Sequence, residues 1–339
     1  MSRVAIWMPV FNEAKHLRKA IDSVLAQTYR DFVLYISDNH STDESRAIID
    51  EYDEIAARVI TLRPETHLAG IPHMRFMWDS IPKGHEYSIH IGGHDLWREN
   101  HLEILVARMD AESKARASAS MPVQPVAIVV PDCWQMNEDD QLVGHYMDIM
   151  QCAQMVLTPQ IVPHWVITGV SSPHLFGLWN EIVRRQVKFR HACAGWDHLI
   201  VMEAAQYGAL LYEGQTVLAL RGAPPTQTMD VYGRRHLSTE RLAAGAQDYI
   251  DQLEWYLHCI DQSFHGAPMP AESVPMYQML SSTAAVCLYT IMRVQNLFAV
   301  PGGMEDFNGR PELKQILGAA AHVNAAMRQM IANGKKLAD

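Results

Sequence analysis

The sequence predicts an α/β fold in which a mostly parallel, twisted sheet is flanked by helices and followed by an all-helical C-terminal extension. Three observations indicate this fold class. Within residues 4–43, short apolar runs alternate with an amphipathic segment, the pattern of strand, helix and strand. A polar loop follows each of the first two apolar runs. Beyond Leu237 the apolar spacing becomes helical to the last residues.

The first two strands and the helix between them follow from apolar spacing. Val4–Met8 is a short and almost wholly apolar run, as in a strand that is covered on both faces, and Phe32–Ser37 is a second such run. Between them, apolar residues recur at helical spacing: Leu17, Ala20, Ile21, Val24 and Leu25. A short βαβ unit makes the two strands parallel, so the loops at 9–13 and 37–43 meet at the carboxyl edge of the sheet. Open α/β folds bind nucleotides at this edge.

Two helix starts are also expected from local sequence. Asn12 is placed to cap the first helix, with Glu13 near its positive end. Ser41-Thr42-Asp43-Glu44 has the form of a capping box for the second helix.

The rest of the chain divides into two expected domains, at 1–236 and 237–339. Ala111–Pro125 is rich in Ala and Ser and is expected to be a mobile connector. Further strands are expected at 59–62, 87–91, 126–130 and 210–220, and further helices at 73–80, 98–110, 195–207, 239–264, 273–299 and 311–333.

Composition excludes several function classes. The formal net charge of −10 over 339 residues argues against a nucleic-acid-binding surface. The five cysteines are scattered without a C-x-x-C motif, which suits free thiols in a reducing cytoplasm. No apolar run approaches the ~20 residues that a membrane span needs, and no signal peptide precedes the first expected strand. A cytoplasmic location is therefore expected.

The two loops carry a family resemblance. Pro9-Val10-Phe11-Asn12-Glu13 and Asp38-Asn39-His40-Ser41-Thr42-Asp43, with Gln27-Thr28-Tyr29 between them, resemble the P-V-Y/F-N-E, D-x-x-S-T-D and Q-T-Y motifs of inverting family 2 glycosyltransferases. That family has the GT-A fold and binds a nucleotide-activated sugar. The resemblance implies that Asp38 binds the pyrimidine base, and that Pro9, Phe11 and Glu13 line the pocket. Asp38 in such a turn commonly satisfies backbone amides instead.

Arg75 lies where the family often has an arginine that reaches the nucleotide, although a solvated helix arginine is nearly as good an interpretation.

Gly92-Gly93-His94-Asp95 stands where the family has its metal-binding D-x-D motif. The resemblance implies that Gly93 and Asp95 face the nucleotide sugar and that His94, Asp95 and His236 hold a divalent cation. Because histidine replaces an aspartate, Mn²⁺ is expected rather than Mg²⁺, which prefers oxygen ligands. Alternatively, His94 touches phosphate or sugar without any metal.

Gly195-Trp196-Asp197-His198-Leu199 stands where the family has an acidic pair before a helix, which implies that Asp197 is the general base. A carboxylate there would take the proton of the acceptor hydroxyl as its oxygen attacks the anomeric carbon. The alternative for Asp197 is a simple helix cap. Trp196 and Trp179 are expected to face sugar, although Trp196 is equally suited to a core. Arg234 and Arg235 resemble a basic segment that closes over the diphosphate, or else they are solvated surface.

Taken together, these residues predict a glycosyltransferase that moves a sugar, with UDP as the expected nucleotide, to a hydroxyl of a glycan or another acceptor. The helical domain is expected to cover the acceptor side, act as a lid or form a homodimer. Two alternatives stay open. One is a catalytically silent relative that binds nucleotide sugar or glycan. The other is a nucleotidyltransferase, against which Gly92 weighs because that chemistry needs a pair of metal-binding carboxylates.

Overall fold

The computed structural model describes residues 2–120, 123–145 and 174–187, residues 200–221 apart from 202, 205 and 206, and single positions between 311 and 325. Two compact units are distinguished, and every strand and helix named below lies in the first, which comprises residues 1–159, 170–189 and 200–223. The domain boundary expected at 236 lies outside the described residues and stays a prediction. So does nearly all of the helical extension.

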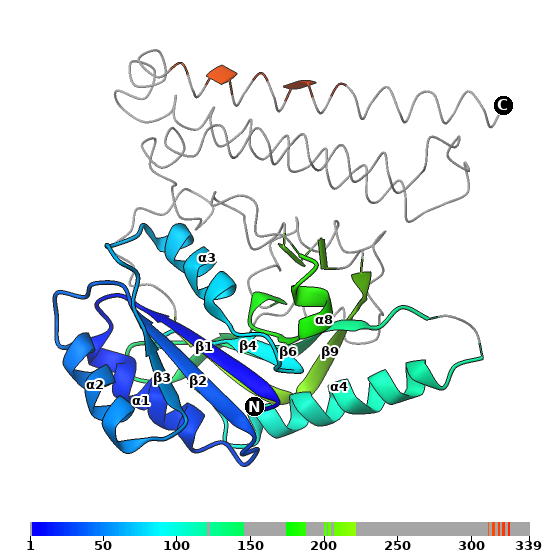
Figure 1. Cartoon of the computed structure of the whole chain (residues 1–339), viewed down its shortest axis with the longest axis horizontal. Helices are drawn as coiled ribbons and strands as arrows, with labels where there is room; N and C mark the ends of the chain where they lie inside the picture. The colour runs from blue at the N-terminus through cyan, green and yellow to red at the C-terminus, as the bar shows by residue number, and fades with distance from the viewer. Residues whose placement is uncertain are drawn as a thin grey trace. The chain divides into compact units, whose positions relative to one another are not determined.

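The described strands form one mixed sheet in the order β3-β2-β1-β4-β8-β6-β9-β5, with β7 paired to β6 (Figure 1). Strands β3, β2, β1 and β4 are parallel to their neighbours, β8 is antiparallel to both β4 and β6, and β6 is parallel to β9. The strand bounds are β1 Val4–Val10, β2 Phe32–Asp38, β3 Val59–Leu62, β4 Tyr87–His90, β5 Leu96–Trp97, β6 Val126–Met136, β7 Leu142–His145, β8 Leu178–Asn180 and β9 Ala209–Arg221. The expected α/β class is confirmed, with parallel pairing across β3-β2-β1-β4 and between β6 and β9.

The described helices are α1 Ala14–Leu25, α2 Ser45–Ile55, α3 Gly70–Ser80, α4 His101–Ala117 and α8 Glu181–Arg184. Helices α1 and α2 connect β1 to β2 and β2 to β3, whereas α3 returns from β3 past β1 to β4. Because α3 leads back across the sheet in the opposite direction, a right-handed crossover places it on the face opposite to α1 and α2. Figure 1 shows α3 and α4 on opposite sides of the strands. No helix in the described parts is both long and apolar enough to cross a membrane.

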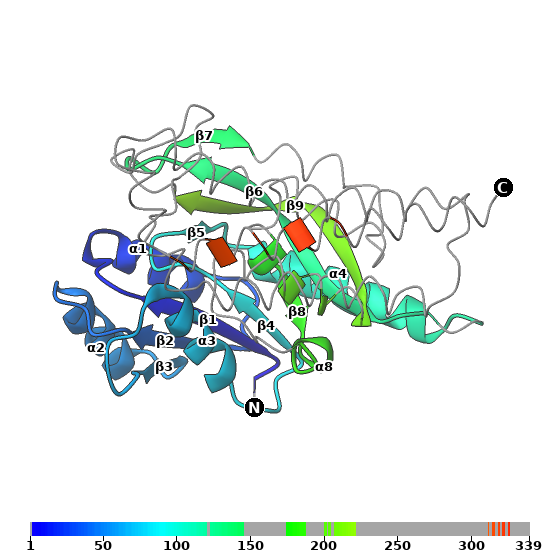
Figure 2. The ribbon, with the colours of Figure 1, turned by 90° about the horizontal axis from the view of Figure 1, so that it is seen from above.

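Helix α4 extends further along the chain than the sequence predicted. It continues to Ala117, through the first half of the segment expected to be a mobile connector. Alanine has the highest helix propensity, so an Ala-rich stretch extends a helix readily. Figure 2 shows α4 running beneath β6 and β9.

The core is built around β1, all of whose residues except Pro9 are buried. Trp7 packs edge-on against Trp78, and Trp78 packs edge-on against Trp179, with ring centroids 6.2 and 5.2 Å apart. The His90 ring at the end of β4 lies between the rings of Trp7 and Phe176, at 4.4 and 4.6 Å. This aromatic layer supports the ends of β1 and β4 from beneath.

Candidate functional site

The loops after β1 and β2 lie side by side, as expected. Val10 is the register partner of Asp38, and the amide of Asn39 donates to the carbonyl of Val10 at 2.9 Å. Both loops turn through residues with positive φ, Asn12 at 56° and His40 at 60°. Asparagine and histidine enter this left-handed region more readily than most residues. The two motifs therefore form one continuous polar edge.

The second loop caps the helix that follows the first. Ser41 Oγ accepts from the amide of Asn12 at 3.0 Å, Ser45 Oγ from Glu13 at 2.8 Å, and an Asp43 carboxylate oxygen from Ala14 at 3.0 Å. Side-chain oxygens on these amides satisfy donors that a helix start leaves unpaired.

The capping residues expected for both helices are therefore wrong. The N-cap of α1 is Glu13 rather than Asn12, and that of α2 is Glu44, neither with a side-chain cap bond. Asn12 Oδ1 instead accepts from Thr42, and Ser41 serves the other helix.

Asp38 is fully buried at the end of β2. One carboxylate oxygen, Oδ1, accepts from the amide of Ser41 at 2.9 Å. The other, Oδ2, has no hydrogen-bond partner among the described residues, and its nearest cation is Arg63, with Nη2 at 3.5 Å. A buried carboxylate oxygen without a donor is costly. Oδ1 thus satisfies the turn, as one interpretation made from sequence expects, and base binding by Asp38 stays a prediction.

An aromatic pair stands beside this carboxylate. Phe11 is 43% exposed, and its ring centroid lies 4.7 Å from that of His67. His67 Nδ1 donates to the carbonyl of Asn39 at 2.9 Å. Asn39 in turn bonds both backbone groups of Leu68, at 2.7 and 2.9 Å. Asn39 thus holds the loop after β3 against the loop after β2.

Asn39, Arg63 and His67 were not among the site residues expected from the sequence. The available signal was topological. Residues 63–68 follow the strand expected at 59–62, so their loop reaches the same carboxyl edge as the two motif loops.

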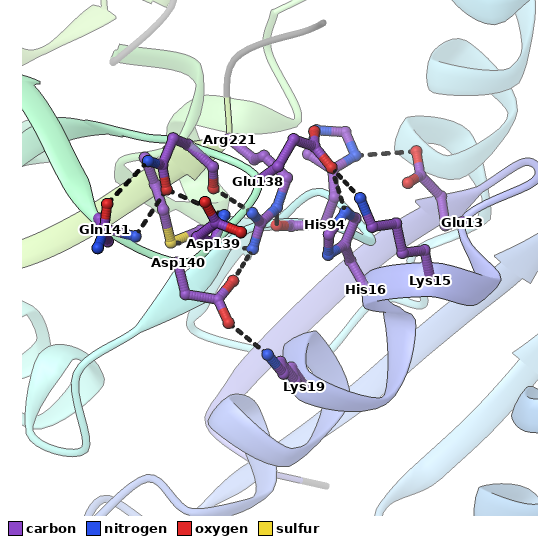
Figure 3. A network of polar contacts seen from close by, with 12 residues as sticks. Glu13, Lys15, His16, Lys19, His94, Glu138, Asp139, Asp140, Gln141 and Arg221 are labelled. Atoms are coloured by element: carbon purple, nitrogen blue, oxygen red, sulfur yellow. Dashed lines mark hydrogen bonds and ion pairs between the residues drawn. The ribbon is translucent and has the colours of Figure 1, made fainter.

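The loop after β4 brings His94 to the first motif (Figure 3). His94 Nδ1 donates to Glu13 Oε1 at 2.8 Å, and His94 Nε2 lies 3.8 Å from Asp95 Oδ1. Burial lowers the pKa of His94, but the hydrogen bond to Glu13 and the charges of Asp95 and Glu13 outweigh burial, so the pKa is raised overall. Gly93 permits this approach, because a Cβ there would lie 3.2 Å from Glu13 Cγ.

Asp95 is turned inward. Its Oδ2 accepts from the amide of Gly92 at 3.1 Å and its Oδ1 from the amide of Arg221 at 2.8 Å. Burial, the largest influence, raises the pKa of this carboxyl. The Asp95 carboxylate also fills the space beside Gly92, where an added Cβ would lie 2.6 Å from Oδ2. Glycine at 92 is therefore a requirement of this packing.

These residues do not fit the divalent-cation site expected from sequence. A hard cation needs several oxygen ligands, whereas the Asp95 carboxylate is buried and already accepts from two backbone amides. No group of three His, Cys, Asp or Glu side chains in the described part of the chain could hold a metal ion. His236, the third expected ligand, lies outside the described residues.

A hairpin between β6 and β7 binds the first turns of α1 (Figure 3). Glu138 pairs with Lys15 and, at 3.1 Å, with His16, while Asp140 pairs with Lys19 and Arg221. Because the Lys15 and Lys19 side chains are 63–69% exposed, their ion pairs contribute little stability.

Arg221 is the buried member of this hairpin network. Its guanidinium donates to the carbonyls of Asn137 and His94 and to Asp140. It therefore fixes the end of β9.

The remaining expected site residues lie in different surroundings. Trp179 was expected to face sugar, and this is wrong: its side chain is fully buried, packs against Trp78 and donates to the carbonyl of Leu175 at 3.2 Å. Arg75 is half-exposed on α3 with Asp79 at 3.7 Å, as a solvated arginine would be. Pro9 pairs with Ser37 in the sheet. Four lie outside the described residues: Trp196, Asp197, Arg234 and Arg235.

The fold and this edge define an α/β protein with a polar site at the carboxyl ends of its parallel strands. A buried acceptor beside an exposed aromatic pair suits a base, and an imidazole one strand away suits an anionic group. Carboxyl ends of parallel strands are where such folds bind nucleotides.

Comparison with known proteins gives the family. Residues 5–127 match the model described as Glycosyl transferase family 2. The match covers the N-terminal part of the chain with both motif loops, and the resemblance seen in the two loops is confirmed.

Two curated relatives and one solved structure are similar to the chain. Glycosyltransferase GlyG of Streptococcus pneumoniae serotype 4 is 30% identical over 102 residues, which cover 30% of this chain and 33% of GlyG. The poly(ribitol-phosphate) beta-N-acetylglucosaminyltransferase TarP of Staphylococcus aureus is 29% identical over 134 residues, 34% of this chain and 39% of TarP. The chain thus spans under half the length of these relatives. The crystal structure of S. aureus TarS residues 1–349 is alike in fold, with 11% identity, 96% and 91% coverage of the two chains and a TM-score of 0.50.

Proposed function

We propose that the protein is an inverting glycosyltransferase that moves a sugar from a UDP-linked donor to a hydroxyl of a glycan or another acceptor. The observation that carries this proposal is the Oδ2 of buried Asp38, which accepts no hydrogen bond from the described residues, beside the Phe11–His67 pair. Uracil carries one ring N–H that pairs with a fixed acceptor, and a flat face that packs on an aromatic ring. The family of residues 5–127 supports sugar transfer as the chemistry.

Binding begins at Asp38. Its Oδ1 is held by the amide of Ser41, so the carboxylate cannot rotate freely and Oδ2 stays directed at the base. A ligand N–H on Oδ2 would satisfy a buried acceptor, and hydrogen bonds to charged groups contribute about 1.5–3 kcal/mol. Arg63, 42% exposed, is free to keep its ion pair or to follow the ligand.

Transfer is assigned to Asp197 on sequence alone. The acceptor oxygen attacks the anomeric carbon while Asp197 takes the hydroxyl proton, and the bond from that carbon to the diphosphate oxygen breaks. A single displacement releases UDP and inverts the anomeric centre. Trp196 would pack on a sugar ring, and Arg234 and Arg235 would neutralise the diphosphate.

The domains and the location expected from the sequence are kept. Residues 1–236 would form the catalytic domain, and 237–339 an acceptor-side, lid or homodimer-forming domain, in a cytoplasmic protein. The Mn²⁺ expected from the resemblance is not included, because Asp95 does not fit a cation site.

A donor panel tests the function. UDP-, GDP- and CMP-linked sugars are incubated with the full chain and nucleotide release is measured, beginning with UDP-N-acetylglucosamine because TarP is named for that sugar. We expect release of UDP that is lost in Asp197→Asn and kept in Asp53→Asn, a control on the exposed face of α2. Donor binding without release would instead indicate a silent relative, and pyrophosphate release from UTP with a sugar phosphate a nucleotidyltransferase.

A further inference from the structure

His94 stands where a donor diphosphate needs a positive partner. It follows β4, whose neighbour in the sheet is β1 with the first motif loop. Its imidazole is 37% exposed, whereas the adjoining Asp95 carboxylate is buried. The loop therefore presents an imidazole to solvent and keeps its carboxylate inside.

Glu13 fixes the state of this imidazole. Its Oε1 accepts from His94 Nδ1 at 2.8 Å, and a carboxylate in this position favours the doubly protonated ring. The imidazolium has an N–H donor on each nitrogen, so Nε2 can donate while Nδ1 is held.

Three other positive groups in the described residues near the first motif loop already have acidic partners. Lys15, Lys19 and Arg221 each pair with a carboxylate of the β6–β7 hairpin. The amides of residues 12–14, where α1 begins, have side-chain acceptors in Ser41, Ser45 and Asp43. A helix start whose amides are satisfied internally has lost its capacity to bind an anion.

We propose that His94, held by Glu13, binds the donor diphosphate directly, so that UDP binds without a divalent cation. This inference rests on the proposed function, because it assumes a nucleoside diphosphate at this edge. His94 then takes the position of the metal-binding carboxylate and supplies the opposing charge itself.

Calorimetric titration of the full chain with UDP and with uridine, in EDTA and in MnCl₂, tests this. We expect UDP to bind equally well in both. His94→Ala should weaken UDP binding about 10- to 100-fold, as for a lost hydrogen bond between charged groups, and leave uridine binding unchanged. Glu13→Gln should weaken UDP binding less, and Glu51→Gln, an exposed glutamate of α2, should not change it. If His94→Ala does not fold, His94→Asn retains a donor for Glu13 and loses Nε2.

The results that overturn the inference are distinct from those that overturn the function. UDP binding that requires Mn²⁺ refutes it, as does a His94→Ala variant that binds UDP as the wild type does. Equal losses for UDP and uridine would indicate a structural role for His94 and also refute it. In all three cases uridine still binds the wild type. A wild type that binds neither uridine nor UDP refutes the proposed function, and the inference with it.

Discussion

Because His90 is buried, the folded protein should lose stability in mild acid, and one substitution at this position should remove that loss. The ring is buried between Trp7 and Phe176, and neither of its nitrogens has a hydrogen-bond partner among the described residues. Burial lowers the pKa of His90 to about 3. Because the folded state holds this ring neutral, the unfolded state binds more protons between that value and the ordinary pKa of about 6.5.

The magnitude follows from linkage. The contribution of His90 to the free energy of unfolding is complete above its unfolded pKa and falls with pH below it. Between about pH 7.5 and about pH 5 the loss amounts to about 2 kcal/mol. His90→Phe removes this loss, since a phenyl ring cannot be protonated. The larger ring costs about 1–3 kcal/mol in strain, independently of pH.

Urea unfolding at several pH values measures the slope. The wild-type free energy of unfolding should fall more steeply toward acid than that of His90→Phe. His73, whose pKa burial lowers to about 4, adds its own slope to both proteins and cancels in the comparison. Parallel curves for the two proteins would refute the reasoning and place the His90 pKa near its ordinary value.

Further substitutions test the packing. Gly92→Ala should lower the melting temperature and weaken UDP binding, because its Cβ would meet the Asp95 carboxylate at 2.6 Å; Gly70→Ala, with nothing within 4 Å, is the matched control. Trp179→Ala should cost about 3–5 kcal/mol in urea unfolding, and a loss under 1 kcal/mol would contradict its place in the core. Glu138→Gln should change the free energy of unfolding by under about 1 kcal/mol in the same assay.

Sequence predicted the parts of the fold whose signal is local. The strands at Val4 and Phe32 were found because their apolar runs are covered on both faces, and the motif loops met at one edge because a short βαβ unit makes its strands parallel. Asp38 could be named as a candidate for base binding for the same reason. Its loop position was visible, and the structure then showed the acceptor oxygen.

What sequence missed depends on contacts distant along the chain. Asn12 looks like a helix cap, but Asp43, 29 residues after Ala14, supplies an oxygen to the Ala14 amide at this helix start. Trp179 offers the same flat ring to a sugar or to a core, and only packing against Trp78 decides between them. Nothing local to Glu138 shows that its hairpin reaches α1.

Because the second motif caps α1, the two loops depend on each other and form one module that should be inherited as a unit. Since Ser41, Asp43 and Ser45 serve amides at 12–14, neither loop can drift in sequence without the other. In chimeras with a relative, exchanging residues 4–45 as one cassette keeps every cap with its amide. Exchanging the first loop alone separates the two halves of this contact. Recombination between these proteins should therefore be tolerated after residue 45 and selected against within the module.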